Sequence, residues 1–341
     1  MKYPWANTFL LLLLTVESLA GVLGLVSGSP DKAAFILIHR VAGWGILAVL
    51  SWKVVNVRRS LRLRRAGSTR VASLALLVVL VLTLTSGFVW SITGPYQVWR
   101  LSGVSWHIYI GVALTPLLIW HAARLTAGLP PSFWADRRTF IRFAGVVGVA
   151  LLLWRVSEAA LAAGDLPGAR RRFTGSYAVP DGRGNSFPQT SWLNDNPAPV
   201  STDSWRVKVH GAVEREFSKG YDDLIEGAAM SATLDCTGGW NTTRVWHGIR
   251  VADLLEEAGP VADAASVTFT SVTGYYRRFS MKEAGSYLLA THVGDELLSH
   301  GHGYPLRLVA PGKRGFEWVK WVTDIRVNRT SKWWQPPLPL Q

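Results

Sequence analysis

Five long apolar runs in the first half of the sequence constrain the fold more than any other feature. We place them near residues 8–27, 34–56, 71–92, 104–124 and 142–163. Each is long enough to cross a bilayer as a helix, which needs about 20 residues. A spanning segment must satisfy its backbone hydrogen bonds internally, so the runs predict an all-α bundle of five transmembrane helices. No convincing cleavage site follows the first run, and we expect it to be a retained span.

The distribution of charge indicates how this bundle is oriented. Residues 1–163 contain 16 Lys or Arg against 4 Asp or Glu, whereas the remaining residues contain 20 against 19. Most of the excess lies in two connections between spans: Arg58, Arg59, Arg62, Arg64, Arg65 and Arg70, then Arg124, Arg137, Arg138 and Arg142. This pattern follows membrane topology and excludes a nucleic-acid surface. The positive-inside rule predicts a multi-pass protein of the cytoplasmic membrane, with the C-terminal domain outside.

Three histidines lie within the predicted spans, where ionisable groups are costly and commonly functional. His39 and His107 lie near the outer ends of their spans, so both imidazoles are expected at similar depth. Two neutral imidazoles on facing helices could ligate the iron of one b-type haem. His121 lies about 21 Å further along the helix of His107 and is an additional candidate ligand. The sequence favours one haem; two haems, or histidines that only bond to neighbouring helices, are the alternatives.

The second half of the chain has the pattern of a domain outside the bilayer. Residues 164–203 are rich in Gly, Pro, Asn, Arg and Ser and have no long period, which predicts a linker that becomes an extended arm. Residues 204–341 mix short alternating runs with short helical segments. The mixture predicts an α+β domain that is large enough for one core.

Cys236 is the only cysteine in the sequence, and it lies in a distinctive local context. The run before it has the pattern of a strand, and Gly238 and Gly239 directly after it indicate a tight turn. Such a turn lets a thiolate, which is a soft ligand, approach a bound group closely. A small buried hydrophobe is the alternative role, and a nucleophile assisted by His247 is another. We expect Cys236 to be a metal ligand.

Two sequence blocks around and after Cys236 resemble the sulfite oxidase superfamily, whose members carry molybdenum on a pterin dithiolene. The first block joins the cysteine turn to Trp246-His-Gly-Ile-Arg-Val-Ala-Asp-Leu-Leu; the second is His302-Gly-Tyr-Pro-Leu-Arg-Leu-Val-Ala-Pro-Gly, followed by Gly315-Phe-Glu-Trp-Val-Lys-Trp-Val. The resemblance implies that Cys236 ligates molybdenum and that His302, Arg307 and Lys320 hold the pterin and its phosphate. A fork-shaped guanidinium and a lysine point charge suit a phosphate. A weaker block implies a further pterin contact from Asn185.

This chain departs from true sulfite oxidases at two positions. They have an arginine five residues after the ligating cysteine, where this chain has Asn241, and a tyrosine in an Ala-Tyr-Glu segment, where it has Thr291. A missing cation weakens the binding of a doubly charged substrate. Trp240 instead resembles the methionine sulfoxide reductase branch of the superfamily, whose catalytic subunit works with a separate haem-bearing membrane partner.

The segment before the fifth apolar run is typical of a twin-arginine export signal. Arg137 and Arg138 are followed by one spacer, Phe140, an apolar residue and a basic residue, ahead of a moderately apolar run. The motif is internal, and an ordinary basic cytoplasmic loop is the alternative. We favour export, because a cofactor inserted in the cytoplasm requires a route that moves folded protein.

Together these patterns predict a membrane-anchored molybdopterin oxidoreductase with a haem b in its anchor. We expect it to exchange electrons with a membrane carrier such as a quinone and to reduce a small sulfoxide or N-oxide. A sulfite-oxidase-like dehydrogenase that delivers electrons to the membrane is the first alternative. A binding module that keeps the fold without catalysis is the second, although the presence of Cys236, Arg307 and Lys320 argues against it.

Overall fold

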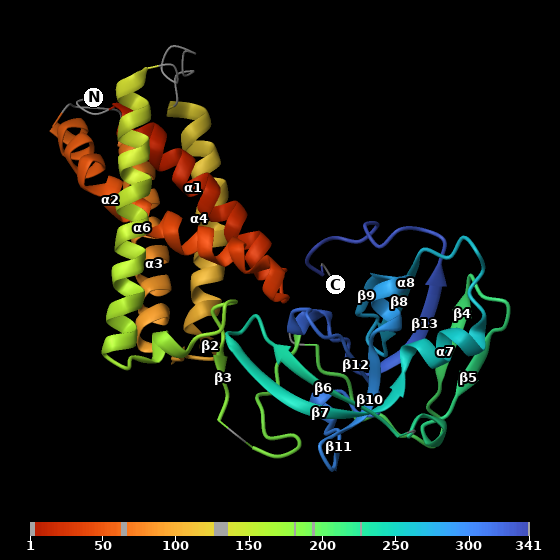
Figure 1. The fold of residues 1–341 in the computed structure, drawn as a ribbon. Coiled ribbons are helices and arrows are strands. Elements are labelled where there is room, and N and C mark those ends of the chain that lie inside the picture. Colours follow the sequence, from red (N-terminus) through yellow and green to blue (C-terminus); the bar gives the residue numbers. More distant parts are fainter. Residues whose placement is uncertain are drawn as a thin grey trace. The chain divides into compact units, whose positions relative to one another are not determined.

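The computed structural model describes residues 4–62, 67–125, 136–180, 182–192, 195–225 and 227–339. Contacts divide the chain into two compact units, Met1–Tyr177 and Ala178–Gln341, and each is described by itself (Figure 1). The narrower division into an anchor, a linker with its arm, and a domain from residue 204 stays a prediction. Arg64 and Arg65, on which the predicted topology partly depends, lie outside the described residues.

The first unit is helical, as the apolar runs predict. Its long helices are α1 (Pro4–Leu25), α2 (Ala33–Arg62), α3 (Gly67–Thr93), α4 (Gly103–Leu125) and α6 (Arg137–Ala163), with short turns η1 (Pro30–Lys32) and η2 (Pro167–Arg170) and a small hairpin of β1 (Gln97–Val98) and β2 (Leu101–Ser102). Among the described residues, these five helices are long and apolar enough to cross a membrane. This confirms the predicted helices; the bilayer and the orientation remain predictions.

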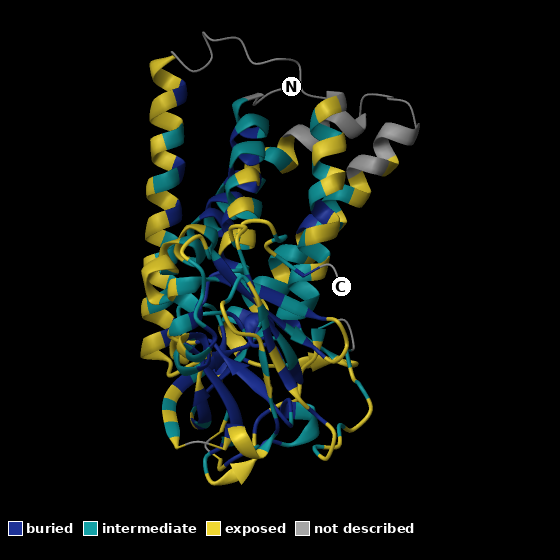
Figure 2. Cartoon of the chain, turned by 90° about the vertical axis from the view of Figure 1, so that its right-hand side faces the viewer, coloured by how far each residue is buried: buried dark blue, intermediate teal, exposed yellow. Residues whose placement is uncertain are grey.

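Packing within this unit leaves much apolar surface uncovered. A core forms where Phe9 and Leu13 of α1 meet Ile46 of α2, with contributions from the other long helices. On the outer faces large apolar side chains such as Val112 and Ile119 stay exposed, and Figure 2 shows exposed residues along the helices. A water-facing bundle would bury such residues, whereas lipid accommodates them.

The second unit combines two sheets with short helices, which confirms the predicted mixture of strands and helices. One sheet contains β6 (Ala228–Asp235), β7 (Trp240–Arg250), β10 (Leu288–Val293), β11 (Glu296–Leu297) and β12 (Arg307–Val309), and the short strand β3 (Tyr177–Ala178) lies where the two units meet in sequence. The other has the order β5 (Phe217–Lys219), β4 (Val207–Gly211), β13 (Val322–Asn328), β8 (Ser266–Ser271), β9 (Tyr276–Ser280). The helical segments are α7 (Val251–Ala258), α8 (Met281–Gly285), η4 (Asp222–Leu224), η5 (His300–His302) and η6 (Gly315–Glu317).

The hairpin of β6 and β7 positions the cysteine. The two strands pair antiparallel from Ala228↔Gly248 to Asp235↔Asn241, and Cys236 is the first residue beyond β6. Its N–H donates to the Trp240 carbonyl at 2.9 Å, while Gly239 adopts φ +91° in the turn. A residue with a Cβ rarely adopts that conformation, which explains the glycine.

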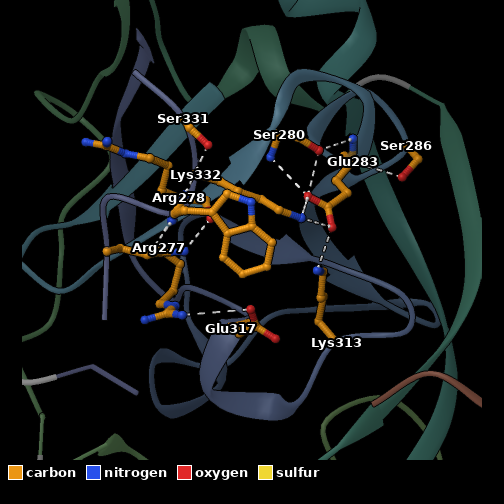
Figure 3. Close-up of polar contacts among 11 residues, drawn as sticks. Arg277, Arg278, Ser280, Glu283, Ser286, Lys313, Glu317, Ser331 and Lys332 are labelled. Carbon is orange, nitrogen blue, oxygen red and sulfur yellow. Dashed lines mark hydrogen bonds and ion pairs between the residues drawn. The ribbon is translucent and has the colours of Figure 1, made fainter. Parts of the chain in front are cut away.

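The segment from Ser331 to Gln335 is fastened to α8 and β9, and Figure 3 shows the contacts around Glu283. Glu283, in α8, accepts from Lys332 at 2.7 Å and from Lys313 at 2.8 Å, and it also forms a capping box with Ser280. Further along, Gln335 exchanges two hydrogen bonds with the backbone of Arg278, at 2.9 and 2.6 Å. The C-terminal segment is therefore part of the folded unit.

Candidate functional site

The Cys236 thiol lies at a buried turn, 6% exposed, and is a free cysteine. The Gly238 N–H donates to Sγ at 3.3 Å. Burial raises the pKa of the thiol, while the Gly238 hydrogen bond and the charge of Arg314 oppose this rise. A thiol in such surroundings ionises when a metal or another positive group binds it.

Arg314 holds the backbone at this turn, a role that the sequence patterns did not reveal. Its Nη1 donates to Asp235 Oδ1 at 2.6 Å and its Nη2 donates to the Cys236 carbonyl at 3.2 Å. Both members of this ion pair are almost fully buried. Gly315 lies so close that a Cβ there would come within 3.2 Å of the Cys236 Cα. The segment 314–315 therefore fixes the position of the cysteine.

His302 is buried and neutral. Burial lowers its pKa to about 4, and both ring nitrogens have partners: Nε2 donates to the Phe187 carbonyl at 3.0 Å and Nδ1 accepts from Ser299 Oγ at 2.7 Å. The Phe187 ring lies 4.0 Å from the imidazole. His302 therefore fastens the segment around Phe187 to η5. Its predicted contact with the pterin stays a prediction.

Arg307 is 3% exposed and has no acidic partner among the ion pairs of the described residues. Its Nη1 donates to the His302 carbonyl at 2.7 Å, and its guanidinium lies over the rings of Trp246 and Trp318. The buried Nε has no partner within the described part of the chain. Burial lowers the pKa of Arg307 to about 10, which leaves it charged at neutral pH.

Lys320 lies near Arg307, since a Cβ placed at Gly303 would be 3.2 Å from the Cβ atoms of both residues. Its Nζ donates to the carbonyls of Thr190 and Gly301 at 2.8 and 2.7 Å. Burial, followed by repulsion from Arg307, lowers the pKa of Lys320 to about 7. The structure thus brings Cys236, Arg307 and Lys320 into one site, from segments that are far apart in sequence.

Thr190 and Trp240 connect the cysteine turn to the Lys320 side of the site. Trp240 Nε1 donates to Thr190 Oγ1 at 3.3 Å, and the same hydroxyl influences the titration of Cys236. Trp240 also packs near Phe187, with ring centroids 6.0 Å apart. Thr190 is not among the residues predicted for the site, because nothing in its local sequence distinguishes it from other polar residues of the arm.

Asn185 is tied to the hairpin that follows β10. Its Nδ2 donates to Glu296 Oε2 at 3.1 Å and to the Leu297 carbonyl at 2.8 Å, and its Oδ1 accepts from the Ser299 N–H at 2.9 Å. Ser299 in turn bonds to His302. Asn185 therefore reaches the site through this hairpin, and its own contact with a pterin stays a prediction.

The residues present fit a molybdenum–pterin group. They combine a free thiol at a tight backbone turn with two basic groups, Arg307 and Lys320, that donate to carbonyl groups. The unpaired, buried Nε of Arg307 gives an independent indication, because a buried charged donor without a partner is costly unless a ligand satisfies it. Such a site can hold an anionic cofactor and present it to a small substrate.

His39 and His107 face one another within the helical unit, with ring centroids 5.8 Å apart. Nδ1 of His39 lies 3.0 Å from the Glu17 carbonyl, and Nδ1 of His107 lies 2.9 Å from the Thr83 carbonyl. A carbonyl only accepts, so each Nδ1 carries the proton and each Nε2 keeps a free lone pair. This is the arrangement in which imidazoles bind metals, because the second nitrogen is held by an outer acceptor.

Two glycines allow these rings to pack closely against neighbouring helices. A Cβ at Gly21 would come within 3.1 Å of the His39 ring, and one at Gly87 within 2.8 Å of the His107 ring. The predicted pair is therefore brought together. His121 does not share these contacts, and its buried Nδ1 has no partner among the described residues. The residues present fit one haem, which stays a prediction.

Comparison with known proteins identifies the second unit. Residues 195–334 match the model of the oxidoreductase molybdopterin binding domain. The chain is 31% identical over 142 residues to the protein-methionine-sulfoxide reductase catalytic subunit MsrP of Xanthomonas axonopodis pv. citri (strain 306), covering 36% of this chain and 44% of that protein. It is 29% identical over 176 residues to the NADH nitrate reductase of Spinacia oleracea, covering 40% of this chain and 19% of that enzyme.

A third relative is the uncharacterized oxidoreductase YuiH of Bacillus subtilis (strain 168), 27% identical over 151 residues, with 43% of this chain and 76% of that protein covered. The chain thus spans less than half the length of the first two relatives, and all three matches cover less than half of this chain. The shared part is an oxidoreductase domain. The match to this domain supports the resemblance of the cysteine turn and the His302–Lys320 block to the sulfite oxidase superfamily.

Proposed function

We propose that this chain is a membrane-anchored molybdenum–pterin oxidoreductase that reduces a small sulfoxide or N-oxide outside the cytoplasm. The observation that carries the proposal is a series of contacts in a molybdopterin-binding domain. It runs from Cys236 through Trp240 and Thr190 to Lys320, which lies near Arg307. When bound, molybdenum supplies the two-electron redox chemistry that moves one oxygen atom.

The residues have distinct parts in this proposal. Cys236 supplies the thiolate ligand, and Arg314 with Asp235 keeps its backbone in place. Arg307 and Lys320 bind the anionic end of the cofactor, while Trp246 and Trp318 exclude water from the guanidinium. Trp240 and Thr190, beside the cysteine, are placed to contact a small substrate.

Two features favour reduction of a neutral substrate over sulfite oxidation. The cation that sulfite oxidases place five residues after the cysteine is Asn241 here, and this loss weakens the binding of a dianion. Trp240 and the similarity to MsrP point the same way. A dehydrogenase that delivers electrons to the membrane is the alternative. It would use the same site, with electrons flowing in the opposite direction.

For the membrane unit we propose a single b-type haem between His39 and His107, which exchanges electrons with a membrane carrier such as a quinone. The support is the facing pair of imidazoles with free Nε2 atoms. Export of the folded second unit by the Arg137–Arg138 signal completes the proposal. Asp136 caps α6 directly before this pair, accepting from the Thr139 N–H at 3.1 Å.

The decisive experiment is metal analysis with a visible spectrum on the detergent-purified full chain. We expect about one molybdenum per chain and a low-spin b-type spectrum. Cys236→Ser is expected to remain folded and to lose reduction of dimethyl sulfoxide by a reduced viologen dye. Full activity of that variant, with molybdenum present, would remove Cys236 from the ligand role. Sulfite-dependent dye reduction that exceeds sulfoxide reduction would favour the dehydrogenase.

Export is tested separately by replacing Arg137 and Arg138 with lysine, which preserves charge and hence the positive-inside signal. The proposal expects the second unit of the variant to stay in the cytoplasm, protected from protease added to spheroplasts. Cleavage equal to that of the unaltered chain would show that the arginine pair is ordinary loop charge.

A further inference from the structure

One face of β7 carries unpaired polar atoms beside the cofactor site. Alternate residues of a strand project to the same side, so Thr242, Arg244 and Trp246 share a face. The residues between them, Thr243 and Val245, are exposed on the other side. The shared face is therefore the inner one, and it begins at Trp240 next to the cysteine turn.

Two guanidinium nitrogens of Arg244, Nε and Nη2, are buried and have no hydrogen-bond partner among the described residues. Nη1 donates to the neighbouring Thr243 carbonyl at 3.2 Å, whereas Nε and Nη2 are buried without a partner in the described part of the chain. Among the arginines of the described residues, Arg244 alone has two such atoms. Nε and Nη2 form the fork that binds two oxygens of a carboxylate, phosphate or sulfate. Burying a charged guanidinium edge without acceptors is costly, and a bound anion would remove this cost.

Thr242 provides a second, independent indication at the same place. Its side chain is 4% exposed, and its buried hydroxyl also lacks a partner among the described residues. A hydroxyl can donate to the same anion as the guanidinium. The adjacent position on this face, Trp246, lies under the Arg307 guanidinium at 5.6 Å and 6.0 Å from the Phe187 ring. Trp246 therefore connects the face with the unpaired atoms to Arg307, which together with Lys320 forms the proposed cofactor clamp.

We propose that Thr242 and Arg244 form an oxyanion-binding subsite on the inner face of β7. Its ligand has at least two oxygens that share negative charge, as in a phosphate or a sulfate-like group. Two sources supply that chemistry: the phosphate of the bound pterin, and an anionic group of the substrate or medium. The first source rests on the proposed molybdopterin function, whereas the second does not require it.

The test compares Arg244→Gln and Arg244→Lys with Arg250→Gln in the full, detergent-purified chain. Arg250 ends the same strand but is exposed and paired with Asp253, so it controls for loss of a β7 arginine. Each variant is prepared with its cofactor and, from cells starved of molybdenum cofactor, without it. The measurements are molybdenum per chain, inhibition of turnover by sulfate, and the rise in melting temperature of the cofactor-free chain with sulfate.

If the anion is the cofactor phosphate, Arg244→Gln lowers molybdenum content several-fold relative to Arg250→Gln. If the anion comes from substrate or medium, molybdenum content is unchanged and sulfate inhibition weakens about tenfold or more, as expected for loss of two charge-assisted hydrogen bonds. In both cases sulfate stabilises the cofactor-free Arg244→Gln chain less than the control.

Equal molybdenum content, sulfate inhibition and sulfate stabilisation in Arg244→Gln and Arg250→Gln would overturn the subsite. If Arg244→Gln fails to fold, Arg244→Lys is the deciding variant, because lysine keeps the charge and lacks the two-pronged guanidinium edge. Sulfate binding by Arg244→Lys as strong as that of the unaltered chain would then refute the proposed subsite. An unaltered chain without molybdenum would refute the proposed function, while the sulfate titration of the cofactor-free chain would still test Arg244.

Discussion

Gly303 offers a sharp test of how the clamp is assembled. It follows η5, adopts φ +113°, and donates to the His300 carbonyl at 3.0 Å. A Cβ at this position would lie 3.2 Å from the Cβ atoms of both Arg307 and Lys320, which is closer than ordinary contact. Gly303→Ala should therefore strain the backbone and also push apart the two cations that we propose hold the cofactor.

A matched control separates these two effects. Gly274, in the turn between β8 and β9, adopts φ +86°, and no atom lies within 4 Å of the position that a Cβ would take there. Gly274→Ala therefore tests backbone strain alone, about 1–3 kcal/mol. Gly303→Ala adds overpacking of about 1–3 kcal/mol. We expect the second unit of Gly303→Ala to melt several degrees below that of Gly274→Ala, at about 2–4 °C per kcal/mol for this size.

Molybdenum content per chain gives the functional half of the measurement. Gly274→Ala should keep the content of the unaltered protein, because its methyl group would meet no atom within 4 Å. Gly303→Ala should lose most of it. Equal melting temperatures and equal molybdenum content in the two variants would refute the argument that Gly303 sets the spacing of Arg307 and Lys320.

Two further predictions concern the fastening of the C-terminal segment and the haem. Burial raises the pKa of Glu283, but hydrogen bonds led by Lys313 outweigh it and hold the pKa below its ordinary value of 4.5. The stabilisation that ionised Glu283 provides is therefore full above about pH 4.5 and is lost as the pH falls. Glu283→Gln should lower the free energy of unfolding, measured with denaturant, by about 1–2 kcal/mol at pH 7 and by progressively less in acid. A difference between variant and unaltered protein that does not change with pH would contradict this. His39→Ala or His107→Ala should each abolish the low-spin b-type spectrum, whereas His121→Ala should keep it; the reverse pattern would show that the haem lies elsewhere.

The sequence predicted those features whose physical cause is local. Long apolar runs predicted the helices, because a span is defined by length and composition alone. Gly238 and Gly239 predicted the turn after Cys236, and the structure confirms a positive φ at Gly239. Positions such as Arg307 were identified through family motifs, which summarise tertiary information that no single window contains.

The residues that sequence reasoning missed act through long-range contacts. Arg314 supports the Cys236 carbonyl across 78 positions, and Thr190 accepts through its carbonyl from Lys320, which lies 130 positions further along the chain. Arg244 has no local pattern that separates it from an ordinary exposed strand charge. Its two unpaired atoms become visible only when the burial of β7 is known.

The partners of the cations give a physical criterion that composition cannot supply. Arg314 and Lys332 are neutralised by carboxylates, those of Asp235 and Glu283, and both cations support the fold. Arg307 and Lys320 are held mainly by carbonyl groups instead. A carbonyl dipole satisfies a donor and fixes its direction without cancelling its charge, so the positive potential remains available to an anion. By this criterion Arg307, Lys320 and Arg244 are suited to bind an anionic ligand, and for Arg307 and Lys320 we propose the phosphate group of the cofactor.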